Sequence, residues 1–328
     1  MPRVRLGTGR EFDLIRAFLD EDEVLPEGVE LGPGDDAAVL EGGWVISTDL
    51  SVEDVHFRRS WLTDEEIGYR AAAAALSDLA AMAATPIGVL VSVAAPRGGR
   101  INLTEVQAGV RAAARAVGAA VIGGDLSRSP GPLFIDVVVL GRAERPISRA
   151  GARAGDEVWV SGTLGAGPAA IESWDAGSVP PDALRGRFAR PAPRVELARA
   201  LAAAEVPTAM LDLSDGLAGD ASHLVAASGA GIIIEEAAVP VDSGARAVLG
   251  ESAALSAALH GGEDFEICFT ARPGTVEAWL AERGSSDPSL VPLTRVGRVV
   301  EGEGVRIESA SGEIRTATRG GYDHWSEA

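Results

Sequence analysis

Acidic residues that follow short apolar runs constrain the fold of this chain more than any other feature of its sequence. Asp35 and Asp36 lie among small residues, and the apolar run 44–46 leads into Ser47-Thr48-Asp49. Such a run is typical of a short buried strand. We expect the Ser-Thr-Asp triplet at the C-terminal end of that strand, where α/β proteins gather ligand-binding groups. Three further acidic turns are expected at residues 123–125, 212–216 and 261–264.

Asp78 lies inside an expected helix and is more informative than any of the acidic turns. Thr63 and the acids behind it predict the helix start, and the alanine-rich segment is expected to continue to about residue 84, before Pro86. The neighbours of Asp78 one helical turn away are alanine and methionine. A buried carboxylate is costly unless it is paired, hydrogen-bonded or metal-bound. Asp78 therefore either contacts solvent at the edge of the apolar face or faces a ligand.

The rest of the chain alternates between strand-like and helix-like segments. Between residues 87 and 142 we expect three strands, at residues 87–95, 119–122 and 133–140, and one helix at residues 103–117. A second series begins at residue 157, after a segment rich in Arg, Ala and Gly. This pattern predicts an α/β (α+β) fold with an N-terminal domain at residues 1–145 and a C-terminal α/β domain at residues 146–328.

The acidic residues, in a chain without lysine, predict a site for a metal ion and a phosphate. Converging carboxylates repel one another unless a cation lies between them. Mg²⁺ is the natural candidate, since it takes oxygen ligands and usually keeps substrate phosphates. All 29 basic residues are arginine, which excludes a Walker A lysine, a kinase-type strand lysine and a Schiff base. Metal ions, Arg and backbone N–H groups at helix starts must therefore meet the phosphate charge.

The net charge and the cysteine content limit which partners the protein can bind and in which cellular compartment we expect it. The net charge of −19 argues against nucleic acid and anionic membranes as partners. Cys268 is the only cysteine, so we expect it to pack within a sheet without a catalytic role, in a reducing environment. The sequence shows neither a signal-peptide pattern nor an apolar run long enough to span a bilayer. We expect a cytoplasmic protein.

Seven short segments occur in an order that points to a family. They are LGPGDDAAVL, STDLSVEDVHF, LSDLAAMAATP, IGGDLSR, DLSDGL, GGEDFEICF and GYDHW. In this order they resemble the motifs of thiamine-monophosphate kinase, within the larger superfamily of aminoimidazole ribonucleotide synthetase, from about residue 9 to residue 325. The resemblance implies an enzyme that transfers the γ-phosphoryl group of ATP to thiamine monophosphate, giving thiamine diphosphate. It also implies a homodimer formed through the N-terminal sheet, and a C-terminal domain that covers the nucleotide cleft.

The resemblance assigns roles to particular residues of this chain. Those implied to hold Mg²⁺ are Asp36, Ser47, Thr48, Asp49, Asp78, Asp125, Asp212 and Asp215. Those implied to contact ATP are Gly124, Asp125, Arg149 and Ser214. Those implied to contact thiamine monophosphate are His56 and Glu263, with Tyr322 or Trp325 near its aromatic heterocycle.

Each role has a plainer alternative. A single acidic turn is explained by a local Asx-turn, and Ser214 by a helix cap. Arg149 is equally consistent with a linker arginine that pairs with surface acids, and His56 with a surface-loop histidine. Glu263, next to Asp264, suits a cationic thiazolium and an aminopyrimidine, but a capped turn also explains it.

The acceptor chemistry predicts a reaction without a covalent intermediate. The acceptor oxygen belongs to an ionised phosphate, so cations that bring the two anions together matter more than a strong base. We expect direct in-line transfer, with His56 as an orienting residue. The alternatives are another ATP-dependent enzyme of the superfamily and a non-catalytic protein that binds Mg²⁺ and nucleotide on the same fold. Selenophosphate synthetase is excluded, because its N-terminal Cys or selenocysteine and its Lys are absent.

Overall fold

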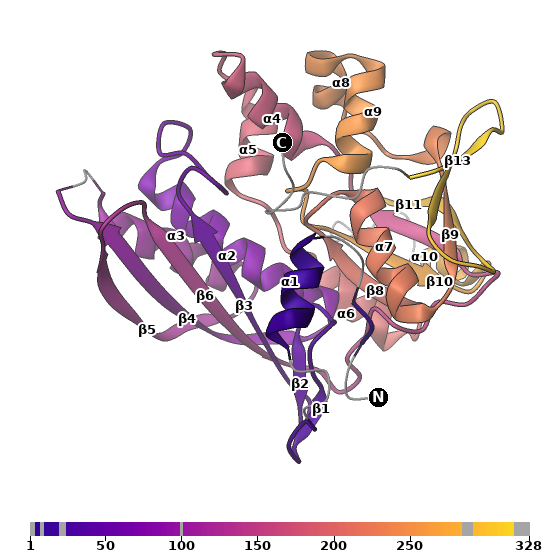
Figure 1. Cartoon of the computed structure of the whole chain (residues 1–328), viewed down its shortest axis with the longest axis horizontal. Helices are drawn as coiled ribbons and strands as arrows, with labels where there is room; N and C mark the ends of the chain where they lie inside the picture. The colour runs from indigo at the N-terminus through magenta and orange to yellow at the C-terminus, as the bar shows by residue number, and fades with distance from the viewer. Residues whose placement is uncertain (1–3, 7–9, 20–23, 99–100, 284–290, 318–328) are drawn as a thin grey trace.

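The computed structural model describes residues 4–6, 10–19, 24–98, 101–283 and 291–317. These residues form two β-sheets with helices packed against them, and Figure 1 shows the first sheet at the left and the second at the right. The expected α/β class with two sheet-containing domains is confirmed. None of the described helices combines the length and the apolar character that crossing a membrane requires.

The first sheet has six strands in the order β1-β2-β3-β6-β4-β5. Their bounds are β1 Val29–Leu31, β2 Ala38–Leu40, β3 Trp44–Val52, β4 Thr85–Pro96, β5 Ala120–Ser129 and β6 Phe134–Arg142. Neighbouring strands are antiparallel except β4 and β5, which are parallel. The helices α2 (Asp64–Ala81) and α3 (Leu103–Ala116) cover one face, and β5 is the outer edge (Figure 1). A short helix, α1 (Arg10–Phe18), precedes the sheet.

The helix that carries Asp78 has defined ends. Thr63 accepts the N–H of Glu66, and the Glu66 side chain accepts the N–H of Thr63, so the expected helix start is confirmed. The alanine-rich middle of α2 is buried. The helix ends at Ala81, slightly earlier than predicted, because the chain turns at Ala83 with a φ of 54°. Asp78 therefore lies in the last turn of a buried helix.

The structure corrects two expectations about the first sheet. The Ser-Thr-Asp triplet at residues 47–49 lies in the middle of β3, not at its C-terminal end, because β3 pairs with β6 over its whole length. Residues 123–125 form no turn, because β5 continues through them alongside β4. Gly124 permits this close pairing, since a Cβ there would lie 1.9 Å from the carbonyl oxygen of Val91.

The second sheet has seven strands in the order β13-β12-β9-β11-β7-β10-β8. Their bounds are β7 Glu157–Ser161, β8 Pro207–Leu213, β9 Gly231–Glu235, β10 Glu266–Ala271, β11 Leu293–Val300, β12 Val305–Glu308 and β13 Ile314–Thr316. The helices are α4 Ala166–Asp175, α5 Asp182–Ala189, α6 Val195–Ala203, α7 Leu217–Ser228, α8 Ser243–Leu249, α9 Glu251–His260 and α10 Thr275–Arg283, with a 3₁₀ turn at Glu236–Ala238.

Alternation along β10 divides the core of the second domain. Ile267 and Phe269 are fully buried in a cluster with α6 and α10, whereas Cys268 belongs to the larger cluster that includes α7. The expected burial of Cys268 within a sheet is confirmed. Burial, reinforced by the nearby Asp220 carboxylate, raises the pKa of its thiol. A thiol in this environment is unreactive.

Candidate functional site

A cavity of about 530 Å³ lies where the two domains meet. Its walls come from β3 and α2 of the first domain and from α4, the end of β8 and the segment before β10 of the second. Eight of the residues singled out in the sequence line it: Thr48, Asp49, His56, Asp78, Asp212, Ser214, Asp215 and Glu263. Residues from distant parts of the chain therefore converge on one cavity.

Three carboxylates form a cluster beside this cavity. Oxygens of Asp36, Asp78 and Asp212 all lie within 4.8 Å of one another. Burial, and then the neighbouring Asp212 and Asp36, raise the pKa of Asp78 well above its usual value. Burial and Asp36 raise the pKa of Asp212 to about 7. Such a cluster of hard oxygen donors fits a divalent cation such as Mg²⁺.

Ser47 and Thr48 point to opposite faces of β3. The Ser47 hydroxyl lies 2.6 Å from Asp78 Oδ2, on the face toward α2, and so touches the carboxylate cluster. The Thr48 hydroxyl instead donates to Asp136 Oδ1 at 2.7 Å. This division follows from the alternation of side chains along a strand. It places Ser47 next to a candidate metal site and gives Thr48 a partner on β6.

Arg149 supplies a positive charge beside the carboxylate cluster of Asp36, Asp78 and Asp212. Its Nε and Nη2 donate to the two oxygens of Asp36 at 3.1 and 2.7 Å, and the Asp36 side chain is completely buried. The backbone N–H of Arg149 and the Ser148 hydroxyl both donate to Asp35. Although burial opposes it, the Asp36 carboxylate raises the pKa of Arg149. Arg149 is therefore a buried ion-pair partner and not a linker arginine among surface acids.

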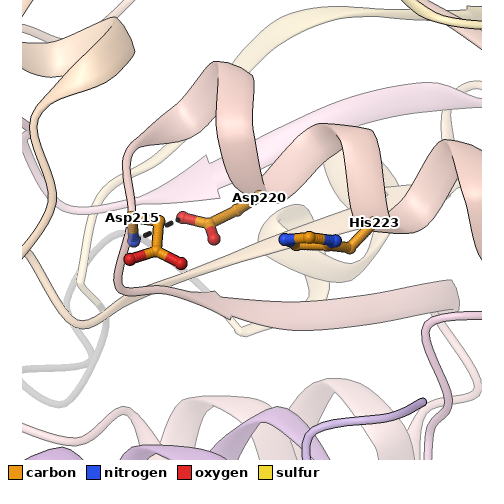
Figure 2. Close-up of side chains that lie close together, drawn as sticks. All are labelled: Asp215, Asp220 and His223. Atoms are coloured by element: carbon orange, nitrogen blue, oxygen red, sulfur yellow. Dashed lines mark hydrogen bonds between the residues drawn. The ribbon is translucent and has the colours of Figure 1, made fainter. Parts of the chain in front are cut away.

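A second cluster joins Asp215 of the Asp-Leu-Ser-Asp-Gly segment to Asp220 and His223 of α7, two residues that the sequence interpretation missed. Figure 2 shows the side chains of Asp215, Asp220 and His223 close together. One polar atom from each lies within 4.8 Å of the other two. Asp220 accepts the backbone N–H of Asp215 at 3.1 Å (Figure 2). Burial, and then the charge of Arg149, lower the pKa of His223 to about 3, so the imidazole is neutral. The available signal was the three-residue spacing of Asp220 and His223, which places them on one face of α7.

Ser214 and Asp264 have roles that the sequence left open. The residue before α7 is Gly216, which makes no side-chain cap, so Ser214 is not the helix cap and its place is on the cavity wall. Asp264 points inward, where it accepts the N–H groups of Gly165 and Ala166 at 2.7 and 3.2 Å, at the start of α4. Burial raises the pKa of Asp264 to about 7. Of the adjacent pair Glu263 and Asp264, only Glu263 lines the cavity.

His56 and Glu263 are held on the cavity wall by specific contacts. The Nδ1 atom of His56 accepts the N–H of Val52 at 3.0 Å, so the neutral ring carries its proton on Nε2. Glu263 pairs with Arg70 of α2, a residue that the sequence interpretation missed. Burial lowers the pKa of Arg70 to about 9, against the effect of Asp49, so the guanidinium is charged at neutral pH.

Two of the residues singled out in the sequence, Gly124 and Asp125, lie away from this cavity. Gly124 and Asp125 line a separate cavity of about 680 Å³ near β5 and α3, together with Val91 and Val106. Asp125 therefore does not line the cavity that Asp49, Asp78, Asp212 and Asp215 line. Tyr322 and Trp325 lie outside the described residues.

Known proteins match both halves of the chain and its full length. Residues 34–143 match the family model of the AIR synthase related protein, N-terminal domain. Residues 153–309 match the family model of the AIR synthase related protein, C-terminal domain. The chain is 36% identical to the thiamine-monophosphate kinase of Rhodopirellula baltica over 314 residues, which cover 92% of each chain. It is 33% identical to the thiamine-monophosphate kinase of Escherichia coli K12, covering 96% of this chain and 98% of the relative.

A solved structure agrees with these relatives. The structure of AaThiL complexed with AMPPCP and TMP superimposes with a TM-score of 0.80 at 30% sequence identity, and the match covers 96% of both chains. Sequence and structure therefore agree over nearly the whole length, and the chain belongs to the thiamine-monophosphate kinase family.

Proposed function

We propose that this protein transfers the γ-phosphoryl group of ATP to the phosphate of thiamine monophosphate, producing thiamine diphosphate. The observation that carries the proposal is the cavity lined by His56 and Glu263, with the cluster of Asp36, Asp78 and Asp212 beside it. A related structure of the same fold is a complex with AMPPCP and TMP, which supports both substrates.

The acids of the site are the proposed holders of Mg²⁺. Asp36, Asp78 and Asp212 would be its central ligands. The remaining proposed ligands are Ser47, Thr48, Asp49, Asp125 and Asp215. Mg²⁺ held by these residues would supply positive charge to offset the negative charge of the donor and acceptor phosphates. Arg149, with Gly124, Asp125 and Ser214, is the proposed contact to ATP.

The other end of the cavity suits the acceptor. Its wall contains the apolar side chains of Val55, Pro168, Ile171 and Phe265. A flat heterocycle can lie against these groups, with its positive charge facing the Glu263 carboxylate. His56 can donate from Nε2 to the acceptor phosphate, which orients it without removing a proton. Tyr322 or Trp325 is proposed to cover the heterocycle.

Phosphorus NMR with ATP, Mg²⁺ and thiamine monophosphate tests the proposed function, with a control that lacks the acceptor. We expect the signals of thiamine diphosphate and a matching amount of ADP only in the complete mixture. ADP with free phosphate in both samples would favour a related synthetase, and binding without ATP consumption would favour the non-catalytic alternative. A phosphoprotein trapped with ATP alone would contradict direct in-line transfer.

The effect of Mg²⁺ on stability is expected to depend on pH. In the metal-free protein the pKa of Asp212 is raised from 3.8 to about 7. Protonation of this group therefore stabilises the fold fully below pH 3.8, and that stabilisation is lost as the pH rises through about 7. Mg²⁺ should bind better to the ionised cluster and remove its repulsion. We expect Mg²⁺ to raise the melting temperature more at about pH 8 than at about pH 5.5; an equal effect at both would contradict the cluster as its site.

We further propose a cytoplasmic homodimer, with a domain boundary near residue 145. The sheet face opposite α2 and α3 exposes apolar side chains, and Leu50, Leu90 and Ile122 are 49%, 39% and 55% exposed. Large exposed apolar areas are typical of protein interfaces. Gly124 and Asp125 lie on the same edge strand as Ile122 and Leu126. A monomer mass in sedimentation velocity at working concentration would contradict the dimer.

A further inference from the structure

Arg70 joins the two domains at the wall of the cavity. It lies on α2, and its Nη1 donates to the carbonyl oxygen of Phe188, the penultimate residue of α5, at 2.6 Å. Its Nη2 pairs with the Glu263 carboxylate. The guanidinium also lies 3.8 Å from the ring centre of Phe188 and 5.6 Å from that of Phe265. The Arg70 guanidinium thus contacts the C-terminal end of α5, two aromatic rings and a carboxylate.

This environment leaves Arg70 little room to contact a ligand. Only 4% of the residue is exposed, whereas 24% of the Glu263 side chain is exposed. Among the described residues that line the cavity, Arg70 is the only arginine, and several carboxylates line the same cavity. The exposed partner of the pair is therefore the acid, and Arg70 acts on a ligand through Glu263.

The backbone of Glu263 is fixed independently of its side chain. Glu263 has a φ of 75°, and its N–H donates to the carbonyl oxygen of Ser214 at 2.8 Å. The preceding Gly262 is packed so closely that a Cβ would lie 2.0 Å from that same oxygen. The end of β8 therefore holds the main chain, and Arg70 of the other domain holds the carboxylate. With both constraints the carboxylate has one defined position.

We propose that Arg70 is a positioning residue that sets the affinity for the cationic heterocycle of the acceptor by holding the Glu263 carboxylate in the cavity. This inference rests on the proposed function and deepens it. A preorganised carboxylate binds a cation without first losing side-chain freedom. Lysine in place of Arg70 has a single ammonium group, which cannot reproduce the planar fork that reaches both Phe188 and Glu263.

The test compares Arg70→Met, Arg70→Lys, Glu263→Gln and the double variant Arg70→Met/Glu263→Gln in steady-state kinetics. We expect Arg70→Met and Glu263→Gln each to raise the KM for thiamine monophosphate about tenfold, with the KM for ATP nearly unchanged. Arg70→Lys, which keeps the charge and the fold, should raise it less. The double variant should be no worse than the poorer single variant, because both changes remove one interaction.

A matched control separates positioning from simple attachment of the helices. Arg185 of α5 pairs with Glu66 of α2 outside the cavity, so Arg185→Gln removes an ion pair between the two helices that the Arg70–Phe188 hydrogen bond also joins. We expect Arg185→Gln to leave both KM values unchanged. The proposed role of Arg70 would be overturned if the increases in the KM for thiamine monophosphate caused by the two single variants multiply in the double variant. It would also be overturned if the KM for ATP rises as much as the KM for thiamine monophosphate. A wild-type protein that does not phosphorylate thiamine monophosphate would instead overturn the proposed function, and this inference with it.

Discussion

Replacing Asp78 with Asn is expected to lower kcat by about 10²-fold or more while the protein stays folded. Asp78 is the member of the cluster that joins α2 to the acids of both domains, and Ser47 already contacts its carboxylate. Asn keeps the shape and the contact to Ser47 but removes a negative ligand from the proposed Mg²⁺ site. Steady-state kinetics at saturating ATP and acceptor, over a range of Mg²⁺ concentrations, measures the effect.

The Asp78 variant also carries an opposite expectation for stability. In the presence of chelator the variant should melt at a higher temperature than the wild type, because one of three repelling carboxylates has been neutralised. Asp175→Asn is a suitable control, since Asp175 is a half-exposed surface acid paired with Arg58. Wild-type turnover of the Asp78 variant at limiting Mg²⁺ would remove Asp78 from the metal ligands.

Replacing Arg149 with Met is expected to destabilise the metal-free protein by about 3–5 kcal/mol. The Asp36 side chain is completely buried, and Arg149 is bound to both of its oxygens. Met fills much of the volume but leaves a buried carboxylate without its cation. Urea denaturation in chelator, compared with the exposed-residue control Arg153→Met, measures the loss.

Mg²⁺ should reduce this loss. A divalent cation bound by the cluster gives Asp36 a new counter-charge, so the difference between the Arg149 variant and the wild type should shrink at high Mg²⁺. Activity should remain low, because Arg149 is also a proposed ATP contact. A destabilisation below about 1 kcal/mol would show that the buried ion pair contributes little beyond its desolvation cost.

Local patterns in the sequence predicted the fold class and the central acid of the site. The capping residues and alanine-rich run located α2, and the absence of charged neighbours on its helix face identified Asp78 as unusual. The acidic segments also singled out Asp36 and Asp212, to which the resemblance assigned a metal-binding role, and the structure places both next to Asp78. Both inferences depended on short segments whose structure is set locally.

The features that the sequence did not predict depend on long-range pairing. The position of residues 47–49 within β3 is set by β6, which lies about ninety residues further along the chain. Arg70 is buried because Glu263, 193 residues away, and Phe188 pack over it. The hydrophobic periodicity of α2 does not predict which distant residues will contact Arg70. Asp220 was missed for a simpler reason: a helical acid close to a turn looks like a capping residue.

The carboxylate cluster has a consequence for the synthesis of the protein. Asp36 and Asp78 are made early, but Asp212 and the cavity wall at Glu263 are added only in the last part of translation. A nascent chain that has folded only its first sheet therefore has two of the three clustered carboxylates and lacks the part of the cavity wall that the second domain supplies. Such a partly synthesised chain cannot consume ATP while it is still attached to the ribosome. Catalysis begins only when the second half has folded against the first.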